Sequence, residues 1–458
     1  MVRRFGLRSI IAGTMVVALF ASACSPSATP SGGSNAATAT PAAGASDAAI
    51  GPKVEVVFWQ RQFEDYQQAW FKKQVAAFNA AHPAIEVKYT AVPGDAWDAK
   101  LKAAQAAGKV PDVLTTNYGA IKPGVVNGQF AKLDGLMKPE AFADIADNVK
   151  DFVRTKDGYF GYAMLVEPST VLYYRKDLFT AAGLDPAKPP KNWDELIADA
   201  RALTKGGVYG MNIAQTAPDL GWSSWGLQYN AAGHLPIADD WSAPRATDPA
   251  YTKLLQLYQT LYTEKLMPQE ATFPYADASF YGQGKVAMSA GGSWEIGQLS
   301  ADFKDTLANT AIAAFPSVDG DATKPTSTLG GWTLTIDAKS KVQQQAADFV
   351  SWLLAGDPAI MTDFFKAAGY SKYSPRASVA AALAADPDAS RNPYLAIVSR
   401  DVLPYAKAEP AYPWDVSIAF GTAIEKAMKG GDIDAALAEA DKAIADVITK
   451  QKLAGTAP

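Results

Sequence analysis

The sequence predicts an α/β protein with two lobes, each a mainly parallel sheet flanked by helices. Two observations carry this expectation. Short runs of β-forming residues alternate with segments of helical periodicity, a pattern typical of parallel sheets. From residue 54 onward roughly 400 residues follow, which is more than one hydrophobic core usually serves. Because ligands of such sheets bind at the carboxyl ends of strands, a site is expected there.

The first part of the folded chain alternates strand and helix. Residues 54–59 form a predicted strand, and apolar residues then recur at helical spacing until residues 79–83 close the segment. Residues 85–89 alternate apolar and charged side chains, as a half-buried strand does. A helix is predicted over residues 97–107, which Gly108 ends, and a strand follows.

The rest of the chain continues this alternation. Its predicted elements are strands at 111–114, 171–174 and 333–336, helices at 177–182, 194–204 and 252–264, and two final helices divided by Gly430-Gly431. Asn192 or Asp194 is expected to cap the helix that runs to residue 204. Gly330-Gly331-Trp332 is expected to open the strand at 333–336.

The N-terminus indicates an exported lipoprotein. Three arginines precede an apolar stretch at residues 10–20, which ends in Ala-Ser-Ala followed by Cys24. The apolar stretch is shorter than the roughly 20 residues of a bilayer span. The pattern predicts a signal peptide at residues 1–23, lipid on Cys24 and a disordered tether at 24–52, which is rich in Ser, Ala, Thr, Pro and Gly. A short transmembrane anchor is the alternative, and Arg3-Arg4 leaves a twin-arginine export route open.

The composition excludes several classes of function. The formal net charge is −5 and no basic stripe is present, so nucleic acid is not an expected partner. Cys24 is the only cysteine, which leaves the body without disulfides or thiolate metal sites. With only His82 and His234, most metal and general-base schemes lack their usual residues. Neither a cofactor nor a metal is expected.

Seven short passages, in order along the chain, carry a resemblance to a known family. They are Gly-Lys-Val-Pro-Asp-Val at 108–113, Gly-Gln-Phe-Ala-Lys-Leu-Asp at 128–134, Leu-Tyr-Tyr-Arg-Lys-Asp-Leu-Phe at 172–179, Trp-Asp-Glu-Leu at 193–196, Gly-Lys-Val-Ala-Met at 284–288, Gly-Gly-Ser-Trp-Glu at 291–295 and Gly-Gly-Trp at 330–332. Together they resemble the extracellular solute-binding proteins (family 1) of carbohydrate ABC transporters, the family that includes maltose-binding protein.

The resemblance implies a type II periplasmic-binding-protein fold with the ligand in a cleft between the lobes. By analogy, lobe one comprises residues 54–166 and 337–385, and lobe two comprises 167–336 and 386–458. The implied function is the capture of a mono- or oligosaccharide and its delivery to an ABC permease, without enzymatic activity. A monomer is expected, outside the cell membrane and held to it only by lipid on Cys24.

A sugar site needs aromatic faces for the C–H surfaces of the rings and carboxylates for the hydroxyls. In lobe one, the candidates are expected at strand ends and at the crossings between lobes. They are Trp59, Glu64, Asn117, Glu167 and Arg376. Each has a structural alternative: packing for Trp59, a solvated helix start for Glu64 and a salt bridge for Arg376.

The other candidates are mostly tryptophans beside glycines, whose missing side chains let a ligand approach the backbone. They are Trp222, Trp225, Trp294, Gly331, Trp332 and Trp414. Trp294 and Trp332, each following a Gly-Gly pair, are the strongest of these. Packing in the core is the alternative for each tryptophan.

Other functions remain open at this point. A binding protein for a polyamine or a peptide would use the same fold. A secreted glycosidase would need two carboxylates about 5–10 Å apart, for which Glu64, Glu167 and Glu295 are available, although no local motif supports it. The aromatic share of 11% favours a neutral sugar.

Overall fold

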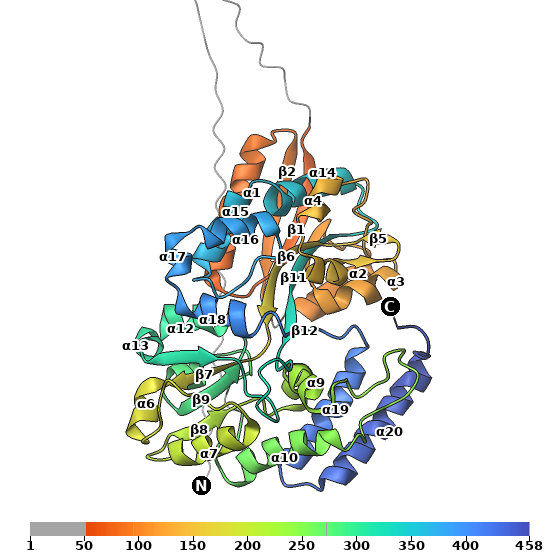
Figure 1. Ribbon diagram of the computed structural model, residues 1–458. Coiled ribbons are helices and arrows are strands. Elements are labelled where there is room, and N and C mark those ends of the chain that lie inside the picture. Colours follow the sequence, from red (N-terminus) through yellow and green to blue (C-terminus); the bar gives the residue numbers. More distant parts are fainter. Residues whose placement is uncertain (1–51, 95, 272, 458) are drawn as a thin grey trace, which may run out of the picture. The chain divides into compact units, whose positions relative to one another are not determined.

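A computed structural model describes residues 52–94, 96–271 and 273–457 of the chain (Figure 1). The expected signal peptide, the lipidated Cys24 and the tether lie outside the described residues, apart from Pro52. Every helix of the described ranges is too short or too polar to cross a membrane.

The first sheet has the strand order β12-β11-β3-β1-β2, with β6 also paired to β11. Its strands are β1 (Val54–Arg61), β2 (Ile85–Val92), β3 (Val113–Asn117), β6 (Tyr162–Pro168), β11 (Thr328–Ile336) and β12 (Lys407–Ala408). β1 is parallel to β2 and β3, and β12 is parallel to β11, whereas β11 runs antiparallel to β3 and β6. The first sheet is therefore mixed: β2, β1 and β3 are parallel to one another, and β11 and β12 run in the opposite direction to β3.

The second sheet has the order β10-β7-β9-β8. Its strands are β7 (Val171–Arg175), β8 (Tyr209–Asn212), β9 (Val286–Gly291) and β10 (Thr310–Ala313). Only β8 and β9 pair in parallel among the described strands of this sheet, since β7 runs antiparallel to both of its neighbours. The expected α/β class is confirmed, but this sheet is mixed. A separate small ladder joins β4 (Arg154–Thr155) and β5 (Gly158–Tyr159).

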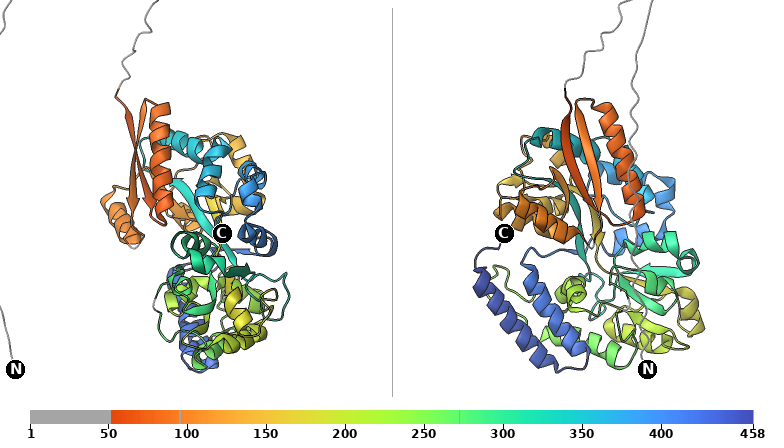
Figure 2. Two further views of the ribbon diagram at one scale, coloured as in Figure 1. Left: turned by 90° about the vertical axis from the view of Figure 1, so that its left-hand side faces the viewer. Right: turned by 180° about the vertical axis from the view of Figure 1, so that it is seen from behind.

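Helices connect and cover the strands. Up to β7 they are α1 (Asp65–Ala81), α2 (Trp97–Ala107), η1 (Tyr118–Ala120), α3 (Ile121–Val126), α4 (Pro139–Ala143) and α5 (Asp147–Val153). Between β7 and β11 they are α6 (Lys176–Ala181), α7 (Trp193–Leu203), α8 (Ala217–Ser223), α9 (Trp225–Ala232), α10 (Ala250–Thr263), α11 (Ser279–Gly282), α12 (Glu295–Asp302) and α13 (Lys304–Ala308). After β11 they are α14 (Gln343–Val350), η2 (Ser351–Ala355), α15 (Pro358–Ala367), α16 (Ala377–Ala384), α17 (Pro387–Ser390), α18 (Pro393–Asp401), α19 (Trp414–Met428) and α20 (Ile433–Gln451). The last two lie side by side in both views of Figure 2.

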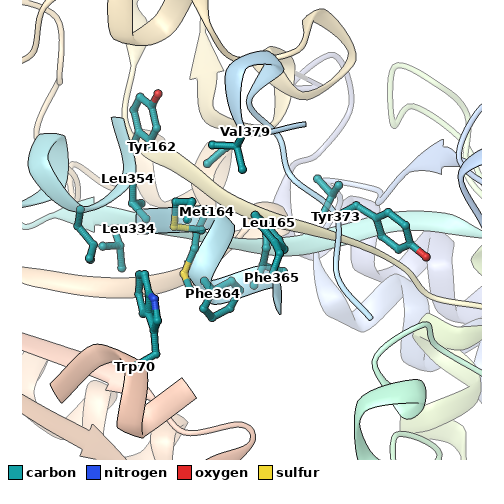
Figure 3. Close-up of a cluster of buried hydrophobic side chains, with 14 of the residues drawn as sticks. Trp70, Tyr162, Met164, Leu165, Leu334, Leu354, Phe364, Phe365, Tyr373 and Val379 are labelled. Atoms are coloured by element: carbon teal, nitrogen blue, oxygen red, sulfur yellow. The ribbon is translucent and has the colours of Figure 1, made fainter. Parts of the chain in front are cut away.

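Two large hydrophobic clusters hold the fold together. In the first, side chains from α1, β6, β11 and α15 meet, among them Trp70, Met164, Leu334 and Phe364 (Figure 3). The second cluster packs α7, α10, α19 and α20 against the second sheet. Within the described residues, both clusters are formed by side chains from Val56 onward, so we expect residues 53–458 to fold on their own.

The chain passes between the sheets at three places. Two residues, Ser169 and Thr170, connect β6 to β7. Residues 314–327 connect β10 to β11, so all of β11 lies in the first sheet, whereas the resemblance assigns residues up to 336 to lobe two. The third passage is extended: α18 contacts β10 of the second sheet, β12 then pairs with β11 of the first, and α19 packs in the second cluster.

Candidate ligand-binding site

Three strands of the first sheet lie side by side where the chain passes between the sheets. Glu167 of β6 is directly opposite Gly330 of β11, and the amide of Glu409, just after β12, donates to the carbonyl of Leu329. A Cβ atom on Gly330 would collide with the Glu409 carboxylate. Opposed residues of a ladder project to one face, so the side chains of Glu167 and Glu409 lie on the same face of the sheet, and the Glu409 carboxylate lies over Gly330. We call Glu167, Gly330 and Glu409 the crossing row.

A buried lysine belongs to the same region. Lys372, between α15 and α16, donates a hydrogen bond to Glu167, and its Nζ lies 3.1 Å from a carboxylate oxygen of Glu64 at the start of α1. The Lys372 side chain is 3% exposed. Burial lowers the pKa of Lys372, but the two carboxylates outweigh it and hold this pKa well above its ordinary value. The ammonium therefore stays charged, and Glu64 and Glu167 share one cation.

Trp332 of β11 lies in an aromatic and cationic stack. Its ring centroid is 4.4 Å from that of Phe63, which follows β1. The Arg61 guanidinium carbon lies 4.9 Å from the Phe63 centroid and 5.3 Å from the Trp332 centroid. Phe63 and Trp332 are both half-buried. Part of each ring is therefore free to contact a solute.

Gly331 and Asn117 support this stack from β11 and β3. Gly331 has a φ of 145°. A Cβ atom on this residue would lie closer to the carbonyl oxygen of Leu165 than any side chain can approach. Trp332 is paired with Asn117, whose side-chain oxygen accepts a hydrogen bond of 2.8 Å from the Ala120 amide. Asn117 is exposed, so its amide nitrogen can still donate to a ligand.

Trp59 is placed differently. It packs with Val92, Trp97 and Leu114 in a small cluster beside α2, and the Lys100 ammonium lies 4.4 Å from its ring centroid. The ring is half-buried between β1 and α2. These contacts are those of the packing alternative.

The second sheet carries its own group of aromatic rings. Trp222 of α8 contacts Tyr275 edge-on at 5.1 Å and lies 6.0 Å from Trp294, which follows β9. The Trp294 ring lies against Gly292, where a Cβ would overlap it, and its Nε1 donates to the carbonyl of Ala276. Trp222 and Trp294 are half-buried, as Trp332 is. The Gly-Gly pair thus makes room for the tryptophan itself.

Trp225 and Trp414 form a separate pair. Their rings meet edge-on at 6.2 Å, and Trp225 donates from Nε1 to the Ser417 hydroxyl. Trp225 is buried in the second core, whereas Trp414, at the start of α19, is 47% exposed. Of the two, only Trp414 offers an open face.

Arg376 is fully engaged within the first lobe. Its guanidinium bonds Asp144 at 2.7 Å and the backbone carbonyls of Leu354, Ala355 and Gly356 at 2.6, 3.2 and 3.0 Å. Arg376 is 5% exposed. Of the two roles open to it from the sequence, the structure shows the salt bridge.

Glu295, next to Trp294, is a buried carboxyl group. It is 1% exposed, and its Oε2 has no hydrogen-bond partner within the described part of the chain. Burial, with a smaller contribution from Asp277, raises the pKa of Glu295 well above its ordinary value. In the described ranges, acidic and histidine side chains form no group of three or more that could hold a metal ion.

Several residues of this region were not predicted from the sequence. Lys372, Arg61, Phe63 and Tyr275 each contact a predicted candidate, and Glu409 lies against Gly330, next to the candidate Gly331. Arg61 and Phe63 had a usable signal, since Arg61 ends β1 and Phe63 follows it at the carboxyl end of the strand. Lys372 and Glu409 had none, because only the fold brings them beside Glu167.

Comparison with known proteins gives one family. The model for bacterial extracellular solute-binding proteins matches residues 64–357. YcjN of Escherichia coli, named for an ABC transporter periplasmic-binding protein, is 29% identical over 163 residues, which are 33% of this chain and 35% of that protein. The mannitol-binding protein of Pseudomonas aeruginosa is 26% identical over 287 residues, or 60% of this chain and 63% of that protein. This chain thus spans less than two thirds of each relative.

A solved structure extends the similarity over nearly the whole body. The cyclic α-maltosyl-1,6-maltose binding protein of Arthrobacter globiformis is 26% identical, with a TM-score of 0.70. The match covers 87% of this chain and 100% of that one. The arrangement of both sheets is therefore that of a known binding-protein fold.

Proposed function

Since the chain belongs to the family of bacterial extracellular solute-binding proteins, we propose that it binds a saccharide and delivers it to the permease of an ABC importer. The half-buried rings of Trp332 and Phe63 on the first sheet, and of Trp222 and Trp294 on the second, carry this proposal. Flat aromatic faces suit the C–H faces of sugar rings, and the rings lie near carboxylates that accept hydroxyl hydrogen bonds.

The two groups of rings have distinct roles. Trp332, Phe63 and Asn117 line the first lobe, and Glu64 and Glu167 accept hydroxyl hydrogen bonds there. Trp222 and Trp294 line the second lobe, and Gly331 lets β11 pack closely against Leu165 and Tyr118, which fixes the backbone that carries Trp332. Trp414 adds an exposed face at the start of α19. Trp59, Trp225 and Arg376 have structural contacts and take a smaller part.

The lobes act as a clamp. A sugar that contacts both groups of rings stabilises the arrangement in which they face each other, because only that arrangement satisfies both sets of contacts. The first lobe is built on the β1 sheet and the second on the β7 sheet, with the three connections between them as hinges. The permease then binds the closed form.

The ligands named for the relatives support a polyhydroxylated solute. One relative is a mannitol-binding protein and another binds cyclic α-maltosyl-1,6-maltose. Both ligands carry hydroxyl groups and no charge. Which of these chemistries fits this chain is decided by a direct test.

The test is a binding screen on purified residues 53–458. Maltotriose, the cyclic maltosyl-maltose, mannobiose and mannitol are compared with spermidine and a tripeptide by thermal shift and tryptophan fluorescence. A saccharide at a hundred times its Kd should stabilise the fold by about 2.7 kcal/mol. Stabilisation by spermidine or the peptide alone would contradict the proposed ligand class. Reducing sugar released from maltotriose over hours would contradict a pure binding role.

The proposal includes an anchor. A signal peptide at residues 1–23 would export the chain, and lipid on Cys24 would hold it at the outer face of the cell membrane beside its permease. Replacing Cys24→Ser should leave saccharide binding unchanged while the protein appears in the soluble fraction. A variant that stays with the membrane would contradict the lipid anchor.

A further inference from the structure

The crossing row places two carboxyl groups over a residue without a side chain. Glu167 is opposite Gly330 in the β6–β11 ladder, and the Glu409 carboxylate occupies the space that a Cβ of Gly330 would take. Any other residue at position 330 would push the Glu409 side chain aside. Glycine here therefore leaves room for the Glu409 carboxylate on the face that also carries the Glu167 side chain.

Among the described residues, no cationic side chain forms an ion pair with Glu409. The groups that face it are Glu167 of β6 and the Tyr118 hydroxyl of η1, which is itself bonded to the carbonyl of Leu165. The ammonium of Lys372 is engaged by Glu167 and Glu64 on the far side of β6. Lys407, which lies in β12 two residues before Glu409, is exposed to solvent. Burial and the charge of Glu167 raise the pKa of Glu409 to about 7.

We propose that Glu167 and Glu409 act as one acceptor site for the ligand, and that ligand binding there releases one proton. This inference rests on the proposed function, because it assigns a further contact and a pH dependence to the same site. The partner chemistry is a hydrogen-bond donor, either a sugar hydroxyl or the ammonium of an amino sugar. Glu409 is half-buried, so one side of its carboxyl group is open to such a donor.

The direction of the pH effect follows from the charges. In the free protein, a proton on Glu409 relieves its repulsion with Glu167. A donor from the ligand stabilises the ionised form of Glu409 and displaces that proton. Affinity should therefore rise with pH up to about 7, the pKa of the free group, and level off above it. Between pH 5.5 and 8.5 the Kd should fall by up to about 30-fold, since each pH unit below the pKa contributes at most tenfold.

The first experiment needs no ligand. Residues 53–458 carrying ¹³C-labelled glutamate carboxyl groups are titrated by NMR, together with Glu409→Gln and the control Glu140→Gln, whose residue is exposed in α4. One signal that titrates near pH 7 should disappear in Glu409→Gln and remain in the control. If the signal lost in Glu409→Gln titrates near pH 4.5 instead, Glu409 carries no proton that a ligand could displace at neutral pH, and the proposal is overturned.

The second experiment measures binding. The Kd values for maltotriose, mannobiose and glucosamine are determined at pH 5.5 and 8.5 in the wild type, Glu409→Gln and Glu140→Gln. A neutral saccharide that binds should bind more tightly at pH 8.5 to the wild type and the control, and equally at both pH values to Glu409→Gln. Glucosamine and its neutral analogue glucose are also compared at pH 7, where part of the amine is still protonated, and tighter binding of glucosamine there would identify an ammonium as the donor.

The outcomes separate the two proposals. Binding of a saccharide with the same pH dependence in the wild type and in Glu409→Gln overturns the inference and leaves the proposed function intact. If none of the saccharides of the wider screen binds, the proposed function fails and the ligand contact falls with it. The carboxyl titration then still decides whether Glu409 holds a proton up to about pH 7 in the free protein.

Discussion

Lys372 and Glu167 form a buried ion pair at the point where the chain leaves the first sheet. Their side chains are 3% and 10% exposed, and Lys372 also contacts Glu64, which precedes α1. The pair therefore joins β6, the start of α1 and the loop after α15. These are the parts of the first lobe nearest to the passage into β7.

Removing the cation should be costly. Lys372→Met leaves Glu167 buried without a partner, so the free energy of unfolding should fall by about 3–5 kcal/mol in urea denaturation at pH 7. Lys73→Met removes an exposed ion pair with Asp363 and should cost less than about 1 kcal/mol. An equal fall in the free energy of unfolding in the two variants would mean that the buried ion pair contributes no more to stability than the exposed one.

Gly331 should tolerate no side chain. Its φ of 145° is a conformation that L-residues rarely adopt, and a Cβ there would lie against the carbonyl oxygen of Leu165 in the paired strand β6. Gly331→Ala should therefore lose about 1–3 kcal/mol of stability, measured by thermal unfolding. Gly119→Ala is the matched control, because a Cβ there meets its nearest atoms only at ordinary contact distance. A Gly331→Ala protein as stable as this control would refute the strain argument.

Glu295 should make stability fall as pH rises. Its folded pKa is raised well above the ordinary value of 4.5, so the folded state holds the proton that the unfolded state loses. The contribution is fully present below about pH 4.5 and is lost toward the folded pKa, at about 1.4 kcal/mol per pH unit. Glu295→Gln, which cannot ionise, should be more stable than the wild type at pH 8. Identical pH profiles in urea denaturation would contradict this.

Local signals allowed parts of the fold to be predicted closely. α2 spans the predicted residues 97–107 because Gly108 ends it with a φ of 63°. α7 begins where expected because the Asn192 side chain accepts a hydrogen bond from the Glu195 amide. Gly330 and Gly331, expected to open a strand, lie inside β11 instead. The Gly-Gly pair predicted that the strand begins after it. In the structure, β11 already starts at Thr328, because residues 328 and 329 pair with β12 and residues 329–334 pair with β6.

The charged part of the site could not be predicted in this way. Lys372 lies 205 residues from Glu167 along the chain, and only the bridge between Val166 and Tyr373 brings the two segments together. Glu409 follows a strand of two residues, which has too little pattern to be recognised. The antiparallel pairs of β7 were missed for a similar reason, since alternation of elements does not reveal strand direction. The positions of Lys372 and Glu409 and the direction of β7 all depend on pairing between segments that are far apart in the sequence.

Arg376 should matter for stability and not for binding. Its guanidinium holds Asp144 and three backbone carbonyls at the end of η2, all within the first lobe. Arg376→Ala should cost about 3–5 kcal/mol, because it leaves Asp144 and these carbonyls without their donor. The protein that remains folded should keep the Kd of the wild type for any saccharide found in the screen. A weaker Kd with unchanged stability would instead place Arg376 in contact with the ligand.

Trp294 and Trp332 should lose binding without losing the fold. Both rings are half-buried and lie against other aromatic rings at strand ends, so truncation removes a stacking face while most core contacts remain. Trp294→Ala and Trp332→Ala should each weaken saccharide binding at least tenfold, measured by tryptophan fluorescence or calorimetry. The control is Trp193→Ala, because Trp193 is 4% exposed and donates to the carbonyl of Pro316 in the second core. That variant should lose about 3–5 kcal/mol of stability and retain the wild-type Kd where it is folded. If Trp294→Ala and Trp332→Ala resemble Trp193→Ala in both measurements, the two rings serve the core, and the ligand contacts must be sought at Trp222 and Trp414.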